Sequence, residues 1–93
     1  MVKKTMFYIV TYDIKEPKRL PRALKICRKY LFWVQKSVFE GELTAVQFRD
    51  FSAEIKSIIN KNEDAVLVYS IRMPELLKKN TIGLEKNQIS FFI

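Results

Sequence analysis

The sequence of 93 residues has no histidine, one cysteine and only two glycines. The absence of histidine excludes catalysis by a histidine base, Ser-His-Asp and Cys-His arrangements, and most zinc sites. The single cysteine, Cys27, excludes an internal disulfide and a redox-active cysteine pair, and agrees with a reducing compartment. A glycine-rich phosphate loop is also missing, so nucleotide hydrolysis of the P-loop kind is not expected.

Long hydrophobic runs are missing too, and no stretch has the length of a membrane-spanning helix. The chain begins Met1-Val2-Lys3-Lys4, like a signal peptide, but strand-like residues follow without a small-residue cleavage site. We therefore expect a cytoplasmic protein with no membrane partner. Residues 1–93 are expected to form a single domain, and a domain this small gains stability from a partner subunit.

What the sequence has in excess is positive charge, and most of that excess lies in one segment. The net charge is +7, and residues 15–36 hold eight of the 17 basic residues but only one of the ten acids. Such a segment is typical of a protein that binds a polyanion, and arginine favours phosphate because its guanidinium group holds two phosphate oxygens. A solvated helix face explains the pattern equally well, and an anionic membrane surface explains it less well.

Hydrophobic patterning in the first third of the chain predicts a strand and a helix. Residues 6–12 are apolar at almost every position, which predicts a central strand covered on both faces. Residues 18–31 carry apolar side chains on one side at helical spacing and basic ones on the other. Pro21 is tolerated only in a first turn, so the regular helix is expected to begin near Leu20. Cys27 lies on the apolar side and is expected in the core.

The remaining two thirds continue the alternation. Residues 33–40 are strand-like with space for a hairpin, and Gly41 is expected to end them. Thr44 and Gln47 form a capping box that begins a second helix. The buried face of that helix is predicted from five apolar residues, Phe48, Phe51, Ile55, Ile58 and Ile59. Residues 65–71 and 88–93 are predicted as further strands.

This order predicts an α+β fold, a two-layer sandwich with both helices on one face of a sheet. The first strand is apolar on both faces, so the other sheet face also needs cover, and self-association is the simplest one. Residues 73–93 are interpreted as a C-terminal extension in which residues 88–93 form an exposed edge strand. That strand pairs either with a second subunit or within its own sheet, and composition does not separate the two.

Asp13 is the one carboxylate with a chemical interpretation. It directly follows the first strand and precedes the basic segment, so it is placed to bind Mg²⁺ beside phosphate-holding arginines. Capping of the next turn is the more common use of such an aspartate. A single carboxylate is too little for a nuclease, unless a symmetric dimer brings two copies together. Most of the other acids are interpreted as solvated surface residues: Asp50, Glu54, Glu63, Asp64, Glu75 and Glu85.

Three aromatic side chains offer a second route to nucleic acid. Phe32, Trp33 and Phe39 are suited to stacking on unpaired bases. In a domain this small, aromatic side chains are more often part of the core. We expect at least two of these three to belong to the core.

Residues 6 to about 72 resemble a known family, the second CRISPR-associated protein. The resemblance begins with Tyr12-Asp13-Ile14, followed by the basic helix with Arg19 and Arg22. It is most specific in the run Val34-Gln35-Lys36-Ser37-Val38-Phe39-Glu40-Gly41-Glu42-Leu43-Thr44, followed by Gln47. Ile82-Gly83 before a final apolar strand is also typical of the family, whereas Pro21 is a departure from it.

The resemblance implies a ferredoxin-like βαββαβ fold, with the middle run split into two strands. It implies a homodimer that exchanges an extra C-terminal strand, and a complex with the CRISPR integrase, the first CRISPR-associated protein. In that complex the dimer bridges integrase dimers during spacer acquisition and binds duplex DNA. Members are also described as Mg²⁺-dependent endonucleases for single-stranded RNA or double-stranded DNA, which implies a phosphodiester hydrolase.

The resemblance also implies roles for particular residues. Asp13 becomes the catalytic residue and Mg²⁺ ligand. Arg19 and Arg22 become phosphate contacts, and the basic face of the helix adds Lys18 and Lys25 to the expected nucleic-acid contacts. Three residues are placed near the site: Tyr12, Ser37 and Phe39.

Three hypotheses follow. The chain is a non-catalytic bridge that binds duplex DNA, a metal-dependent phosphodiesterase, or a toxin-type endoribonuclease of the virulence-associated D kind. The segment 34–40 argues against the third.

Overall fold

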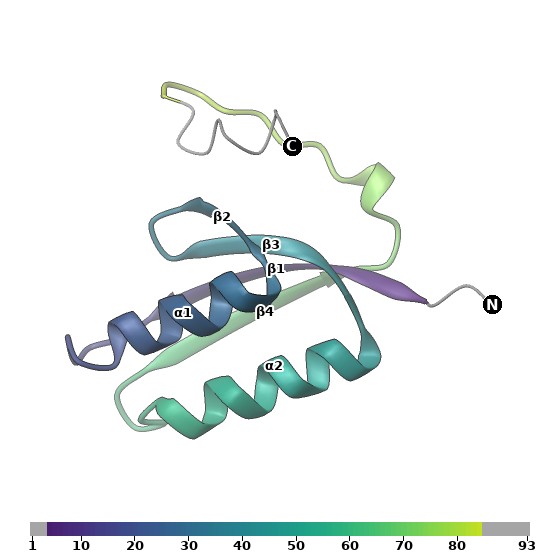
Figure 1. Cartoon of the computed structure of the whole chain (residues 1–93). Helices are drawn as coiled ribbons and strands as arrows, with labels where there is room; N and C mark the ends of the chain where they lie inside the picture. Colours follow the sequence, from purple (N-terminus) through teal and green to yellow (C-terminus); the bar gives the residue numbers. More distant parts are fainter. Residues whose placement is uncertain (1–3, 85–93) are drawn as a thin grey trace.

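The computed structural model describes residues 4–84 of the chain and shows a two-layer α+β sandwich. Its elements are β1 (Thr5–Asp13), α1 (Leu20–Tyr30), β2 (Phe32–Gln35), β3 (Val38–Thr44), α2 (Ala45–Ile58), β4 (Ala65–Ile71) and the short 3-10 helix η1 (Pro74–Leu76). The strands form one antiparallel sheet in the order β2-β3-β1-β4, and both helices cover the same face (Figure 1). This is the predicted ferredoxin-like fold.

In the middle of the chain, the structure corrects the predicted end of one strand. The run predicted at 33–40 divides into β2 and β3, joined by a tight turn at Lys36 and Ser37. Gly41 does not end a strand, because β3 continues through it to Thr44. An added Cβ at Gly41 would lie 3.2 Å from Cδ2 of Leu31, so the glycine lets that leucine pack closely on the strand.

Both helices begin where their sequences predict. The helix expected over 18–31 begins at Leu20, so Pro21 lies in the first turn and removes no helical hydrogen bond. The α2 capping box is present. The main-chain nitrogen of Gln47 donates to Oγ1 of Thr44 over 3.2 Å. The main-chain nitrogen of Thr44 donates in turn to Oε1 of the Gln47 side chain over 2.8 Å. These bonds satisfy donors that a helix end leaves free.

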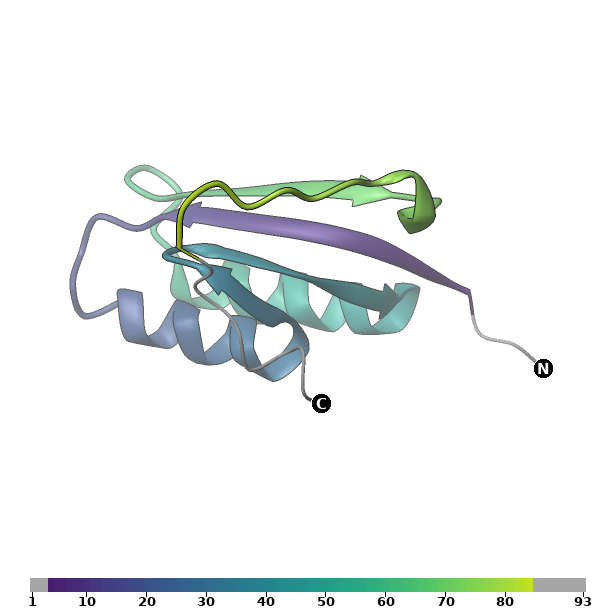
Figure 2. The ribbon, with the colours of Figure 1, turned by 90° about the horizontal axis from the view of Figure 1, so that it is seen from above.

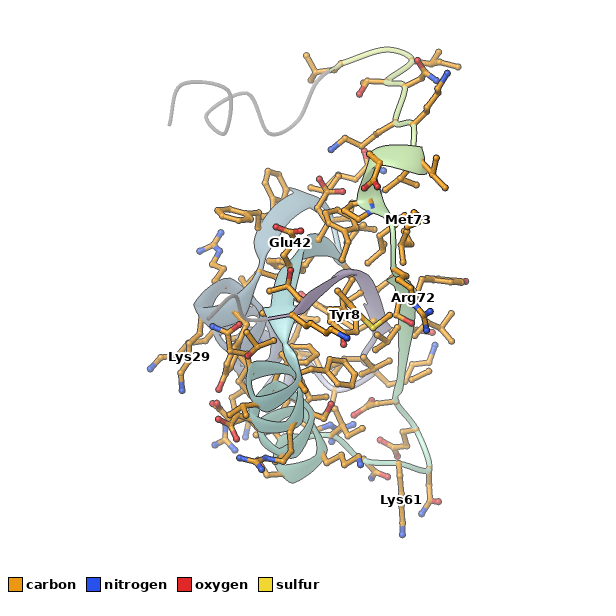
Figure 3. All side chains as sticks on the ribbon, turned by 90° about the vertical axis from the view of Figure 1, so that its right-hand side faces the viewer. Tyr8, Lys29, Glu42, Lys61, Arg72 and Met73 are labelled. Atoms are coloured by element: carbon orange, nitrogen blue, oxygen red, sulfur yellow. The ribbon has the colours of Figure 1, made fainter. Side chains whose placement is uncertain are left out.

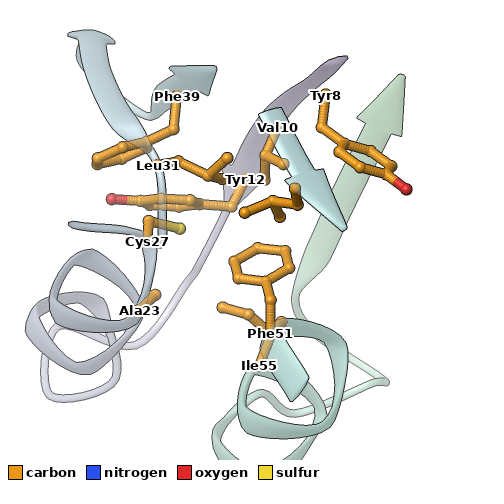
Figure 4. Packing of buried hydrophobic residues seen from close by; sticks show 10 residues of the cluster. Tyr8, Val10, Tyr12, Ala23, Cys27, Leu31, Phe39, Phe51 and Ile55 are labelled. Carbon is orange, nitrogen blue, oxygen red and sulfur yellow. The ribbon is translucent and has the colours of Figure 1, made fainter. Parts of the chain in front are cut away.

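The core lies between the helices and the sheet (Figure 4). Alternate residues of β1 face the helices, so Tyr8, Val10 and Tyr12 are buried. Cys27 of α1 is fully buried among them, and loss of solvation raises the pKa of its thiol to about 12. The predicted role of Cys27 as a small core residue is confirmed.

The opposite sheet face, here called the open face, is apolar but not fully covered. The intervening residues of β1, such as Phe7 and Ile9, lie on it beside Ile71 and Tyr69 of β4. Leu67 and Tyr69 remain 55% and 56% exposed. The chain after η1 runs back above this face (Figures 1 and 2).

In the described part of that returning segment, Nζ of Lys79 lies 2.9 Å from Oε2 of Glu40 and so joins the segment to the sheet. The predicted strand at 88–93 lies outside the described residues. Within residues 4–84, no helix has the length and apolar character required to cross a membrane.

Candidate nucleic-acid and metal site

Asp13 is the last residue of β1 and pairs with Ala65 at the start of β4. Its side chain is 67% exposed, and Oδ2 lies 3.1 Å from Nζ of Lys15. Over residues 4–84 its carboxylate accepts from no main-chain amide, so Asp13 does not cap the following turn. By strand alternation Asp13 is on the open face, with Phe7 and Ile9.

The cap of that turn is Asp64, which the sequence did not reveal. Its carboxylate is fully buried and accepts from the main-chain nitrogens of Lys15, at 3.0 Å, and of Asn60, at 2.8 Å. It also accepts from Nε and Nη2 of Arg19, at 2.8 and 3.2 Å. Asp64 therefore joins the β1–α1 loop, which directly follows Asp13, to the α2–β4 loop.

The expectation that Asp64 is a solvated surface acid is wrong. The guanidinium group of Arg19 is the main cause of a pKa for Asp64 that lies far below its ordinary value. Burial acts in the opposite direction, and the two main-chain amide hydrogen bonds add to the lowering by Arg19. Asp64 is therefore a charged, buried anchor at ordinary pH.

Arg19 is the partner of this anchor. Besides its two bonds to Asp64, Nη2 lies 3.0 Å from Oε1 of Glu63, and the side chain is only 20% exposed. Hydrogen bonding to Asp64 raises the pKa of Arg19 further. Three carboxylate contacts therefore compensate much of the charge of this guanidinium group, whereas Lys18, Arg22 and Lys25 form no ion pair within residues 4–84.

Three expected nucleic-acid contacts form an exposed strip along α1, here called the basic strip: Lys18, Arg22 and Lys25. Their spacing of four and three residues places Arg22 and Lys25 on one side of α1, with Lys18 leading into it. In the described part of the chain none of the three forms an ion pair, whereas Lys29 is held by Glu54 at 3.0 Å. The strip therefore presents uncompensated positive charge to solvent.

The three residues expected near the site lie together, but on the helix side of the sheet. The Tyr12 amide nitrogen donates to the carbonyl oxygen of Ser37 over 3.2 Å, and the rings of Tyr12 and Phe39 stack at 6.2 Å. Burial is the main cause of a raised pKa for Tyr12. Tyr12 and Phe39 are core residues that fix the end of β1, and Asp13 follows directly on the other face.

The aromatic expectation is confirmed. Phe39 is fully buried, and Trp33 is half-buried and packs against the core. Phe32 is 63% exposed.

The described residues offer a metal ion few protein ligands. Among residues 4–84, no three side chains of the acidic or cysteine type are grouped closely enough to hold a metal ion. Asp13 supplies one exposed carboxylate, already paired with Lys15. Mg²⁺ is usually held by one or two carboxylates and completes its oxygen shell with waters and substrate phosphates. One chain therefore offers the minimum of protein ligands, and a second Asp13 from a partner would double it.

Fold and site together define a small ferredoxin-like domain with a basic helix and a lone carboxylate at a strand end. Residues 6–79 match the family model of the CRISPR associated protein Cas2, and the chain belongs to this family. It is 43% identical over 89 residues to the CRISPR-associated endoribonuclease Cas2 of Thermococcus kodakarensis, covering 95% of this chain and all of the relative.

Two further comparisons agree. The CRISPR-associated endoribonuclease Cas2 of Dictyoglomus turgidum is 40% identical over 83 residues, covering 89% of this chain and 94% of the relative. A crystal structure described as that of Cas2 superposes with a TM-score of 0.81 at 34% identity, covering 90% of this chain and 93% of the other. The family that residues 12–14 and 34–44 predicted is therefore confirmed.

Proposed function

We propose that this chain is a CRISPR adaptation subunit that binds duplex DNA along α1 and bridges integrase dimers during spacer acquisition. The observation that carries the proposal is the basic strip, whose three cations are exposed and without ion pairs in the described structure. Such cations bind phosphates and release counterions, which gives binding that weakens steeply with salt. Arg19 is left out of this surface because Asp64 and Glu63 hold its Nε and Nη2 donors.

Charge reversal of the basic strip tests this proposal. The triple variant Lys18→Glu, Arg22→Glu, Lys25→Glu is expected to weaken duplex binding by at least about 100-fold at low salt. It should also flatten the plot of log K against log salt by about 0.9 per lost phosphate contact. Fluorescence anisotropy with a labelled duplex at several salt concentrations measures both.

The matched control reverses three cations outside the strip: Arg49, Lys56 and Lys61. Arg49 and Lys56 belong to α2, and Lys61 extends from the α2–β4 loop on the far side from Lys29 (Figure 3). This control changes the net charge by the same amount and should bind nearly as well as the wild type. Equal losses in both variants would show that overall charge, not the strip, drives binding.

We propose further that the working unit is a homodimer formed through the open face. The support is apolar surface that one chain leaves uncovered, including Leu67 and Tyr69 at more than half exposure. Residues 73–93 are proposed to contribute to the same interface, with 88–93 as a pairing strand. A two-fold axis through this face would bring both copies of Asp13 to one composite site.

A second candidate function is Mg²⁺-dependent endonuclease activity on single-stranded RNA or double-stranded DNA. The relatives from Thermococcus kodakarensis and Dictyoglomus turgidum carry the name endoribonuclease. Asp13 is placed for this role because it lies on the open face and is two-thirds exposed. Bound Mg²⁺ would supply stabilisation of the negative charge on the phosphodiester. The two Asp13 carboxylates of a dimer are the groups proposed to hold it.

The variant Asp13→Asn tests the endonuclease. We expect cleavage of a labelled single-stranded RNA to fall by about 100-fold or more, because the charged ligand is lost. Chelation of Mg²⁺ should abolish the wild-type activity in the same gel assay. The control Asp50→Asn removes an exposed acid of α2 and should cleave like the wild type. Undiminished cleavage by Asp13→Asn would refute the catalytic role.

The same variant separates the two functions in a cellular assay of spacer acquisition. If bridging is the function, Asp13→Asn still supports acquisition, whereas the variant with the reversed basic strip does not. If cleavage is required, both variants lose acquisition although Asp13→Asn still binds DNA.

A further inference from the structure

A groove lies beside the basic strip, at the sheet end where Asp13 is found. It has a volume of about 480 Å³ and runs between α1 and the turn that joins β2 to β3. Eight residues line it: Tyr12, Leu20, Pro21, Leu24, Arg28, Trp33, Lys36 and Ser37. Its volume is in the range of sites that hold small ligands, about 300–1,000 Å³.

The groove combines an apolar wall with positive charge. Leu20, Leu24 and Arg28 follow one another at intervals of four residues, so they share the side of α1 that faces the hairpin. Leu20 is 42% exposed there, although it is a large apolar residue. Arg28 and Lys36 are exposed, and no acidic side chain is among the lining residues. An anion with an apolar part fits this lining.

The hairpin wall of the groove is held in a fixed conformation. Lys36 has φ of 42°, in the left-handed region that a residue with a side chain rarely adopts. Two hydrogen bonds hold the turn: Nε1 of Trp33 donates to the carbonyl oxygen of Lys36 over 3.0 Å, and the Tyr12 amide nitrogen donates to that of Ser37 over 3.2 Å. Strained positions of this kind persist where the surrounding structure holds them, and they cluster at binding sites.

We propose that this groove binds one unpaired nucleotide of a nucleic acid that lies along α1. The base packs against Trp33 and the apolar side of α1, and the neighbouring phosphates lie at Arg28 and Lys36. Aromatic surface combined with cations is the usual arrangement for single-stranded nucleic acid. A paired base has both faces in the stack and does not enter, so the groove is selective for unpaired strands. The inference rests on the nucleic-acid binding proposed above.

Trp33 is the only tryptophan of the chain, so its fluorescence reports directly on the groove. The full chain is titrated with a dye-labelled single-stranded oligonucleotide and, separately, with a blunt-ended hairpin duplex. Dye anisotropy measures binding, and tryptophan emission measures contact with the groove. We expect the single strand to quench emission by about a third or more, because bases stack on or near the indole. The duplex should bind with little quenching.

The outcomes separate this inference from the proposed function. A bound single strand that leaves tryptophan emission unchanged overturns the groove and leaves the basic strip standing. Equal quenching by the blunt duplex also overturns it, because the groove then does not select unpaired bases. If neither nucleic acid binds, the proposed function fails and the groove fails with it.

Two variants test the cations of the groove. Arg28→Glu with Lys36→Glu is expected to weaken single-strand binding by about 10-fold or more, with duplex affinity changed much less. Lys36→Gly removes the cation and suits the left-handed turn, so it should weaken single-strand binding without loss of thermal stability. The control Arg49→Glu with Lys56→Glu should bind single strands like the wild type. If Lys36→Gly retains full affinity, Lys36 contacts no phosphate.

Discussion

Replacement of Asp64 by alanine is expected to lower the melting temperature by roughly 10 °C or more. The variant leaves the guanidinium of Arg19 and the amides of Lys15 and Asn60 without the carboxylate that now accepts from them. Loss of one partner from a buried ion pair is among the most damaging single changes, because the remaining charge stays buried. Thermal unfolding followed by circular dichroism measures the effect.

Two comparisons make this result specific. Asp64→Asn keeps an acceptor but no charge, so its melting temperature should lie between those of the wild type and Asp64→Ala. Asp50→Ala removes an exposed acid and should melt within about 2 °C of the wild type. A melting temperature for Asp64→Ala as high as that of Asp50→Ala would show that the anchor contributes nothing.

The sign of the pH dependence follows from the lowered pKa of Asp64. In the unfolded chain an aspartate has a pKa of about 3.9, whereas in the folded chain Arg19 keeps Asp64 ionised to lower pH. Below that value the unfolded state binds more protons than the folded state, so stability falls as pH falls. The difference in unfolding free energy between wild type and Asp64→Asn should be constant above about pH 5 and shrink below pH 4.

Introduction of charge on the open face is expected to separate the proposed dimer into single chains. In Leu67→Glu with Tyr69→Glu, two carboxylates per chain would have to be desolvated in the interface, next to the same charges from the partner. We expect the wild type to elute with twice the mass of one chain in size-exclusion chromatography with light scattering. At the same concentration the variant should elute as a single chain.

The matched control for this experiment is Val46→Glu. Val46 is 55% exposed, the same fraction as Leu67, but it lies in the first turn of α2 rather than on the open face. It should remain dimeric, because a carboxylate near a helix N-terminus is favourable. A variant with two charges on the open face that still forms dimers would place the interface elsewhere. Loss of cleavage in that monomer would support a composite Asp13 site.

Local sequence signals predicted most of the fold. The strand at 65–71 was predicted with its observed bounds, because a uniform apolar run lies between two polar segments. The Thr44–Gln47 capping box fixed the start of α2, and Pro21 fixed the start of α1. Gly41 was misread as a strand end although the alternation of Phe39, Gly41 and Leu43 continues through it.

The candidate site was predicted less completely, for a physical reason. The basic strip can be found from helical spacing, since it depends on neighbours along one helix. The anchor of Asp64 depends on Arg19, which is 45 residues away in the sequence, and no local pattern reveals such a pair. An aspartate just before a strand has the sequence pattern of any turn residue, and only the folded structure brings a guanidinium group to it. For the same reason Arg19 was grouped with the solvent-facing cations.

The burial of Cys27 has a practical consequence for experiments on this molecule. Burial raises the pKa of the thiol to about 12, so almost none of it is thiolate at pH 8, and the sulfur is shielded from solvent. Maleimide and methanethiosulfonate reagents should therefore not react with Cys27 in the folded protein. A single cysteine introduced on the surface can then be given a spin label or a dye in the otherwise unaltered protein. Distances between two labelled copies would report directly on how the subunits are arranged.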